Sequence, residues 1–344
     1  MIPTMNEFLK SILDGINSFI GNYGWSVVIF TLLIKLVLMP FDYKSRVSMR
    51  KTQALQPKLN ELQKRYANDK EKLNKKMAEL YQKEKISPMS SCLPMLLTMP
   101  VLFAMFAAMR LVAGENMVAQ TFAILQGSEP VMESWLWVKN IWMPDSPFYG
   151  TIVDQQNLNM IPADIWSKVL SGLDTATVSL LADKGVIVSE LQGMITAGSK
   201  TTAIGQTLFP LLQATEAYQA EMALWHELPK LNLLIMQLTI YAKPNGWFIL
   251  PILACVTQLL MSSTTQQPQQ PQAEGQPNTG AFMKYFFPLF SLFICSSYNA
   301  AFSVYWVVSN IFAWAEQLIF NKVFEMQDRA GNNSKSVKEE DSIK

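Results

Sequence analysis

The chain has 344 residues, of which 50% are hydrophobic and only 16% are charged, and its formal net charge at pH 7 is +1. Soluble domains carry about 25% charged residues, so the low charge and the gathering of apolar residues into runs exclude an ordinary soluble domain and indicate a membrane protein. The length allows two domains, and a net charge near zero says nothing about partners.

Residues 1–22 are expected to form an amphipathic helix that lies along the membrane surface. Their apolar side chains recur at helical spacing and are Phe8, Leu9, Ile12, Leu13, Ile16, Phe19 and Ile20. A cleaved signal needs a basic region before its apolar core, and this segment carries only Lys10 against Glu7 and Asp14. An ordinary packed helix is the alternative interpretation.

Residues 24–43 are expected to form the first membrane span, and one cation, Lys35, lies inside its apolar stretch. About 18 helical residues rise about 27 Å, which is close to the thickness of a hydrocarbon core. An ammonium placed there costs about 2.5–3.5 kcal/mol, so the position predicts a functional site. Thr31 lies one turn earlier on the same face. The alternative is that Lys35 reaches the inner headgroups along its own stem.

Residues 44–91 form a charged segment in which cations outnumber acids. Positive loops of this length stay in the cytoplasm, which places the N-terminus outside. Narrow apolar stripes predict two antiparallel helices, with Pro57 kinking or restarting the first and a turn at Asn68-Asp69. The stripe residues are Leu55, Leu59, Leu62, Leu73, Met77, Leu80 and Tyr81. The basic surface is either a solvated face that sets topology or a contact for anionic lipid, ribosomal RNA or incoming chains.

The second span is expected at residues 92–113, where Pro100 interrupts an apolar stretch. Residues 114–245 follow as a large outer segment with more acids than bases. Residues 178–194 and 208–224 have helical periodicity. The prediction for this segment is a small, mostly helical extracytoplasmic insertion with no recognisable chemistry.

Three further spans are expected at residues 246–263, 282–298 and 300–320. A Gln/Pro-rich stretch, residues 264–281, is too polar to fold and is expected to be a flexible cytoplasmic loop. The last span is less apolar than the others, so its polar residues are expected to face other helices or a wet cavity. Residues 321–344 form a cytoplasmic tail of mixed charge. The fold class is therefore predicted to be all-α and polytopic, with five transmembrane helices.

Motifs for metal, cofactor or covalent chemistry are missing from the sequence. Cys92, Cys255 and Cys295 fall in or beside apolar runs without a CxxC pair, so they exclude a disulfide framework and are expected to be small buried hydrophobes. His226 is the one histidine and has no cysteine nearby, which argues against zinc or haem. No phosphate loop, GxSxG or HExxH occurs, so no cofactor, metal or catalytic residue is expected.

Several of these stretches together resemble the YidC family of membrane protein insertases. The first two are NYGWSVVIFTLLIKLVLMPFDYKS and ALQPKLNELQKRYANDKEKLNKKMAELYQKEKISPMSSCLPMLLTMPVLFAMF. The others are GWFILPIL and VYWVVSNIFAWAEQLI, with a weaker likeness near LWVKNIWMPDS in the outer segment. The linked order of spans, basic hairpin and SN-containing last span makes the resemblance specific.

The resemblance implies five core helices around a hydrophilic groove that is open to the cytoplasm and to lipid. Lys35 stands where the family usually has an arginine in its first core span, and an ammonium lacks the planar fork of a guanidinium. The other positions that the resemblance places along the groove are Thr31, Thr98, Tyr305, Trp306 and Ser309. Tyr305 and Trp306 resemble an aromatic pair that contacts the nascent chain. Thr98 departs from the Gln found before Met-Pro in many members.

The function implied is that of an insertase and chaperone, and not of an enzyme. Its substrates would be nascent or newly made membrane proteins in the bacterial plasma (inner) membrane, with the C-terminus cytoplasmic. The ribosome, the Sec translocon and anionic lipids at the basic hairpin are the further candidate partners, and DNA is not one. A secondary transporter or channel with Lys35 as ion site is the alternative, although no internal repeat supports it. A membrane enzyme is a third reading that no motif supports.

Overall fold

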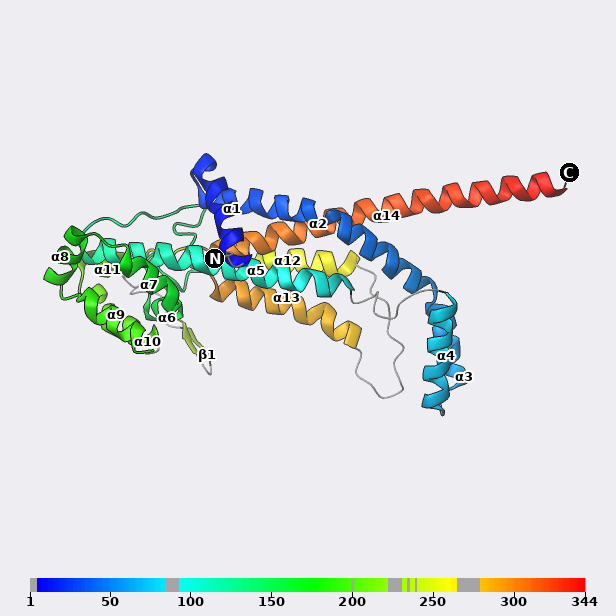
Figure 1. The fold of residues 1–344 in the computed structure, drawn as a ribbon, viewed down its shortest axis with the longest axis horizontal. Helices are drawn as coiled ribbons and strands as arrows, with labels where there is room; N and C mark the ends of the chain where they lie inside the picture. Colours follow the sequence, from blue (N-terminus) through cyan, green and yellow to red (C-terminus); the bar gives the residue numbers. More distant parts are fainter. Residues whose placement is uncertain are drawn as a thin grey trace. The chain divides into compact units, whose positions relative to one another are not determined.

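The computed structural model describes residues 5–84, 93–198, 201–221, 231–233, 236–238, 240–264 and 279–343. Most of the described residues are helical (Figure 1). The core helices are α2 (Tyr23–Ala54), α5 (Leu93–Leu125), α12 (Ile249–Thr264), α13 (Thr279–Ser297) and α14 (Ala300–Ile343). The expected loop at 264–281 and His226 lie largely or wholly outside the described residues.

The remaining elements are short. The other helices are α1 (Met5–Ile20), α3 (Gln56–Arg65), α4 (Lys70–Lys83), α6 (Gln155–Met160), α7 (Ala163–Ser171), α8 (Thr175–Asp183), α9 (Val188–Thr196), α10 (Thr201–Gln213) and α11 (Glu216–Glu221). Strands β1 (Leu231–Leu233) and β2 (Met236–Leu238) pair antiparallel, so the outer segment is not wholly helical.

The chain divides into two compact units. The first comprises Met1–Phe30, Val101–Ala254 and Ser291–Trp306, and the second comprises Thr31–Pro100, Cys255–Phe290 and Val307–Lys344. Each core helix contributes one end to each unit.

Two helices in the described part of the chain are long and apolar enough to cross a membrane. They are α2 and the Met99–Leu125 part of α5, while α12 is apolar but shorter. Pro100 and Pro288 lie inside α5 and α13 without ending them. The helices α2, α5 and α14 continue well past the expected spans, because hydropathy marks the lipid-facing stretch and not the point where helical hydrogen bonding stops.

In the second unit, the polar end of α2 packs along α14. The Tyr43 ring contacts Phe320 edge to face and stacks on Phe324, with centroid distances of 5.3 and 5.7 Å. Arg50 lies over the Phe324 ring at 5.0 Å and forms an ion pair with Asp328. Tyr43 and Arg50 are seven positions apart on α2, and Phe320, Phe324 and Asp328 are four apart on α14, so each set lies on one helix face.

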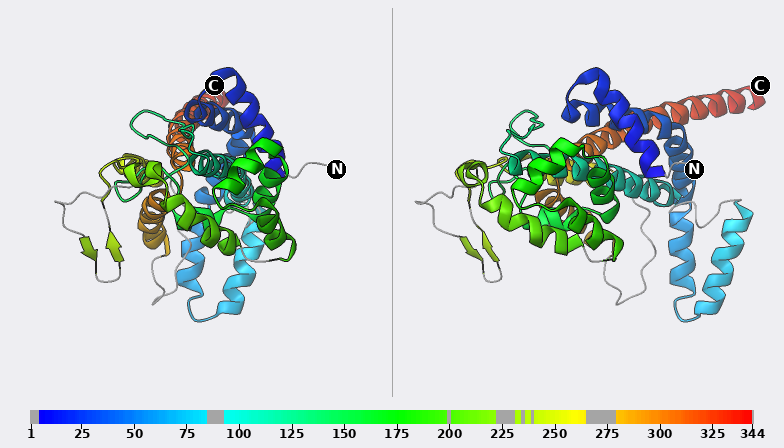
Figure 2. Two further views of the ribbon diagram at one scale, coloured as in Figure 1. Left: turned by 90° about the vertical axis from the view of Figure 1, so that its left-hand side faces the viewer. Right: turned by 60° about the vertical axis from the view of Figure 1, so that its left-hand side comes forward.

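The helices α3 and α4 form an antiparallel hairpin, seen in light blue in Figure 2. Pro57 lies in the first turn of α3, where its missing N–H leaves no bond unmade. Asp69 caps α4 by accepting a hydrogen bond from the backbone N–H of Lys72. The Lys58 ammonium and the Glu84 carboxylate join the open ends at 2.9 Å.

In the first unit, the outer segment is built from short helices that end at turns. Residues 178–194, expected as one helix, are the two helices α8 and α9, separated by a turn at Gly185 with φ +85°. Glycine permits this left-handed conformation at no steric cost, which periodicity does not reveal. The 208–224 stretch similarly covers the end of α10 and the whole of α11, and its last three residues lie outside the described part of the chain.

A buried carboxylate, Asp145, holds the start of α12. Its side chain is 0% exposed. It accepts hydrogen bonds from the backbone N–H groups of Trp247 (2.8 Å) and Leu250 (2.6 Å) and from the Trp137 indole (3.0 Å). Gly246 permits this approach, because a Cβ there would lie 1.9 Å from a carboxylate oxygen. Asp145 lies about 100 residues before α12 in the sequence, and it accepts hydrogen bonds from the N–H groups at the start of that helix.

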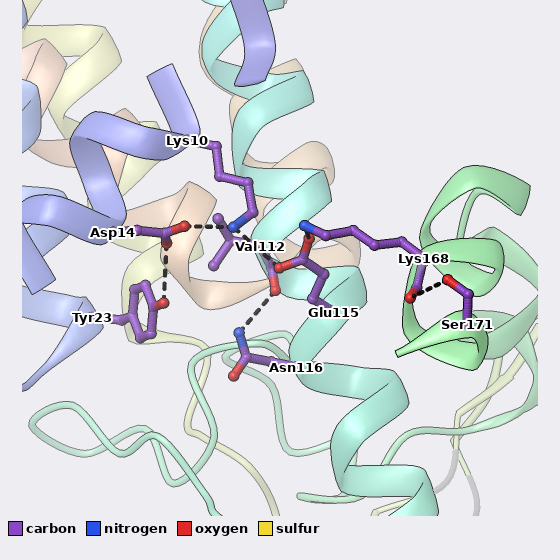
Figure 3. Close-up of polar contacts among 8 residues, drawn as sticks. All are labelled: Lys10, Asp14, Tyr23, Val112, Glu115, Asn116, Lys168 and Ser171. Carbon is purple, nitrogen blue, oxygen red and sulfur yellow. Dashed lines mark hydrogen bonds and ion pairs between the residues drawn. The ribbon is translucent and has the colours of Figure 1, made fainter. Parts of the chain in front are cut away.

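A network of charges ties α1 to the outer segment (Figure 3). The Lys10 ammonium lies 2.5 Å from Asp14 and 3.1 Å from Glu115, and Lys168 reaches Glu115 at 2.6 Å. The Tyr23 hydroxyl donates to Asp14 at 3.1 Å. Burial opposes the charged form of Lys10, but its hydrogen bonds with Asp14 and Glu115 outweigh this effect and raise the pKa of Lys10.

The apolar face of α1 is divided between protein and surroundings. Leu9 and Leu13 are buried, whereas Phe8 and Phe19 are exposed. One side of the helix therefore packs as an ordinary protein helix does. The exposed phenylalanines are compatible with the predicted position of α1 along the membrane surface, which stays a prediction.

We predict that Asp145→Ala lowers the free energy of unfolding by about 2–4 kcal/mol, because one buried and two partly buried N–H groups lose their acceptor. Asp145→Asn should have a smaller effect, since its amide oxygen can still accept. Thermal unfolding in detergent measures both. Asp183→Ala, at an exposed carboxylate at the end of α8, is the matched control and should leave the transition unchanged. Equal stability of Asp145→Ala and the wild type would contradict the capping role.

We predict that Glu115→Gln loosens α1, because Lys10 and Lys168 both lose their carboxylate. A loss of about 1–2 kcal/mol corresponds to about five- to thirtyfold faster amide exchange in α1. Hydrogen–deuterium exchange with peptide resolution measures it. Glu190→Gln, at an exposed carboxylate of α9, is the control. Unchanged exchange in α1 would show that the Glu115 carboxylate does not hold the helix.

Candidate functional site

A polar stripe runs along the apolar helix α2 within the second unit. Its members are Thr31, Lys35, Asp42 and Arg46, spaced four, seven and four residues apart. These intervals place all four on one face of an α-helix. Thr31 is fully buried, and Lys35, Asp42 and Arg46 are half-buried.

The helix α14 brings a buried carboxylate to this stripe. Glu316 is 3% exposed, and its Oε2 lies 3.6 Å from the Arg46 guanidinium. Its Oε1 is buried without a hydrogen-bond partner among the described residues. Arg46 also lies over the Phe320 ring, 5.6 Å from its centroid. A carboxylate this deeply buried needs a nearby cation, and Arg46 supplies it.

The Lys35 ammonium belongs to the same group of charges but is bound differently. Asp42, Glu316 and Arg46 all act on it electrostatically. Within the described ranges, however, no hydrogen bond or ion pair reaches its nitrogen. Two cations and two carboxylates give this cluster a formal charge of zero, while the three donors of Lys35 remain available to a further acceptor.

Other polar side chains of the second unit lie on neighbouring core helices. Ser309 on α14 is half-buried, and the next residue, Asn310, donates to the Thr257 hydroxyl of α12 at 3.3 Å. The backbone of Thr98 lies in α5, but its side chain is outside the described part of the structure. Groups of three or more His, Cys, Asp or Glu that could hold a metal ion do not occur among the described residues.

The aromatic pair expected from the sequence lies in the first unit. Tyr305 is 6% exposed, and Trp306 is half-buried. Phe302 lies between them and a further aromatic pair: its centroid is 5.5 Å from Trp306, 5.3 Å from Phe106 and 5.2 Å from Tyr298. The Trp306 indole N–H is buried without a partner among the described residues. Of the pair, Trp306 keeps the more accessible ring and an unused donor.

The structure therefore brings some of the expected site residues together and adds others. It places Thr31 and Lys35 on one face of α2. Arg46, on the same face, forms an ion pair with Glu316 of α14. In the sequence, Arg46 is one of the many cations of the segment 44–91. Two signals point to the pair: Arg46 continues the helical spacing of Lys35, and Glu316 is an acid inside an apolar span that needs a counter-charge.

The chain is similar to known proteins over most of its length. The family model described as 60Kd inner membrane protein matches residues 15–197 and 201–328. A membrane protein insertase YidC of Fusobacterium nucleatum is 37% identical over 145 residues, covering 42% of this chain and 62% of that protein. Those of Thioalkalivibrio sulfidiphilus and Campylobacter jejuni are 35% and 44% identical over 181 and 94 residues, covering 50% and 27% of this chain and 30% and 18% of theirs.

The matched part spans less than two thirds of each of these relatives. The family model, in contrast, matches most of this chain, and the resemblance to the YidC insertases is confirmed. The family description and the bacterial relatives place the chain in the bacterial inner membrane. Since the match extends through both units, the chain belongs to the 60Kd inner membrane protein family.

Proposed function

We propose that this chain is a membrane protein insertase and chaperone. It receives nascent or newly made membrane proteins in a hydrophilic groove open to the cytoplasm and releases their apolar spans into the lipid bilayer. The observation that carries the proposal is the ammonium of Lys35, which lies inside an apolar helix and has no partner bonded to it among the described residues. The names of the curated relatives support the same activity.

In this proposal the core helices α2, α5, α12, α13 and α14 are the five membrane spans. The N-terminus is outside, the α3–α4 hairpin and the C-terminus are cytoplasmic, and the segment 114–245 is the outer insertion. The length and apolarity of α2 and α5 support two of these spans, and the positive charge of the hairpin supports the orientation.

The polar stripe of α2 would lower the barrier for the polar end of a substrate. Water and one cation raise the local polarity, and Lys35 attracts acidic residues of a short translocated tail. The substrate's own apolar span supplies the driving force, because burying about 20 apolar residues in lipid is favourable. No nucleotide is needed for this step.

The remaining positions have narrower roles in the proposal. Thr31, Thr98 and Ser309 supply hydroxyls along the groove, and Trp306 contacts the substrate while Tyr305 supports it from within the aromatic cluster. The basic hairpin contacts anionic headgroups or the ribosome, and the Sec translocon is a further partner. Exposed cations on α3, such as Lys58 and Arg65, support the lipid contact, although each also pairs with an acid of the hairpin.

The test of the proposed function is depletion of the protein in its own cell. Membrane insertion of a small single-span substrate with an acidic tail should fall, as measured by protease protection of the translocated tail. Re-expression of the chain should restore insertion. If depletion leaves insertion of such substrates unchanged, the proposed function is wrong.

We predict that Lys35→Ala lowers insertion of substrates with two acidic tail residues about tenfold, while Lys35→Arg is tolerated because it keeps the charge. Protease protection of substrates with acidic and neutral tails, in the depleted cell, measures this. Lys44→Ala, at an exposed cation of the same helix, is the matched control and should behave as the wild type. Normal insertion of acidic tails by Lys35→Ala would mean that the charge is incidental.

A further inference from the structure

Two cations compete for one buried carboxylate in the second unit. Glu316 lies 3.6 Å from the Arg46 guanidinium and also acts electrostatically on Lys35. In the structure, Arg46 holds this carboxylate, and within the described residues no ion pair reaches the Lys35 ammonium. Whether Glu316 pairs with Arg46 or with Lys35 decides whether the Lys35 ammonium is free or already neutralised.

We propose that Arg46 is a positioning residue that sequesters Glu316 and thereby keeps Lys35 open for an acidic group of the substrate. The proposal rests on the insertase function proposed above and adds a determinant of substrate specificity to it. Arg46 acts through Glu316 and Lys35 and does not itself touch the substrate.

The side-chain chemistry favours Arg46 as the holder of Glu316. A guanidinium is less strongly hydrated than an ammonium and offers a rigid fork to a carboxylate, so it suits a buried pair. Phe320 orders it further, because the ring lies 5.6 Å from the guanidinium carbon. Among the described residues no aromatic ring lies under the Lys35 ammonium, and its flexible stem lets the ammonium move toward an incoming acid.

The second carboxylate, Asp42, is the strongest attractive charge acting on Lys35, but no ion pair joins the two side chains in the described part of the chain. It lies seven residues further along α2, which is about 10 Å of helix rise. It lies only four residues before Arg46, which is the spacing of neighbours on a helix face. Asp42 therefore lies near both cations and acts on Lys35 as well as on Arg46. Of the two carboxylates, Glu316 is the one that forms an ion pair within the described part of the cluster, and its partner is Arg46.

Charge counting makes the consequence specific. The group of Lys35, Asp42, Arg46 and Glu316 has a formal charge of zero. Without Arg46 its charge is negative, and Lys35 is the remaining cation for a carboxylate that is too deeply buried to stay unpaired. Glu316 then occupies Lys35, and an acidic substrate must displace it. Removing Glu316 as well leaves Lys35 free again.

The experiment compares Arg46→Met, Glu316→Gln and the double variant in the depleted cell, using one single-span substrate with either two Asp or two Asn in its tail. Arg46→Met should lower insertion of the acidic tail about tenfold, equivalent to about 1.4 kcal/mol, and the neutral tail less than about twofold. Glu316→Gln should raise the ratio of acidic-tail to neutral-tail insertion. The double variant should recover insertion of the acidic tail to within about twofold of the wild type.

Lys44→Met, which removes an exposed cation from the same helix, is the matched control. Equal loss for acidic and neutral tails in Arg46→Met would indicate a purely structural role and overturn the proposal. A double variant as defective as Arg46→Met would also overturn it, because Arg46 would then not act through Glu316.

A second measurement needs no substrate. Lys35 in the purified protein is labelled with an amine-reactive reagent and quantified by peptide mass spectrometry, with Lys44 as internal reference. Labelling of Lys35 should fall about fivefold in Arg46→Met and return in the double variant, because an ion pair protects the amine. Unchanged labelling overturns the proposal. If the wild type inserts no substrate, the insertase function fails, while the labelling still decides whether Arg46 holds Glu316.

Discussion

The ion pair between Arg46 and Glu316 is the interaction on which the arrangement of the second unit depends. A carboxylate 3% exposed within an apolar helix is tolerable only beside a cation, and its attraction joins the first core helix to the last. The aromatic contacts of Tyr43 with Phe320 and Phe324 follow the same line of contact. Together these contacts fix the rotation of α2 about its own axis. That rotation sets the direction in which the Lys35 side chain points.

The first unit obeys the same electrostatic rule with different residues. Its partly buried charges are satisfied in place: Asp145 by N–H groups at the start of α12, and Glu115 by Lys10 and Lys168. These groups hold the outer segment and α1 to the ends of core helices. Lys35 differs from them because, in the described part of the chain, its charge has no bonded partner. That contrast distinguishes a structural charge from one available for binding.

Membership of the 60Kd inner membrane protein family agrees with this difference between charges that hold the structure together and a charge that is available for binding. An insertase has to stabilise polar groups of many different substrates for a short time, so it benefits from a weakly committed charge in a hydrated environment. A flexible ammonium meets that requirement, whereas a rigid guanidinium suits a permanent pair. In the proposed function, Lys35 supplies the flexible charge, and Arg46 on the same helix face forms the permanent pair with Glu316.

Local sequence patterns were enough to predict the helical character of the core, the shared face of Thr31 and Lys35, and the turn before α4, because periodicity, charge and capping act over a few neighbouring residues. They also predicted one helix at 178–194 where the chain turns at Gly185, since a single left-handed residue leaves the apolar spacing intact. Only the tertiary structure decided the partner of Glu316 and the burial of Tyr305. Those properties depend on contacts between residues far apart in the chain, which no local pattern records.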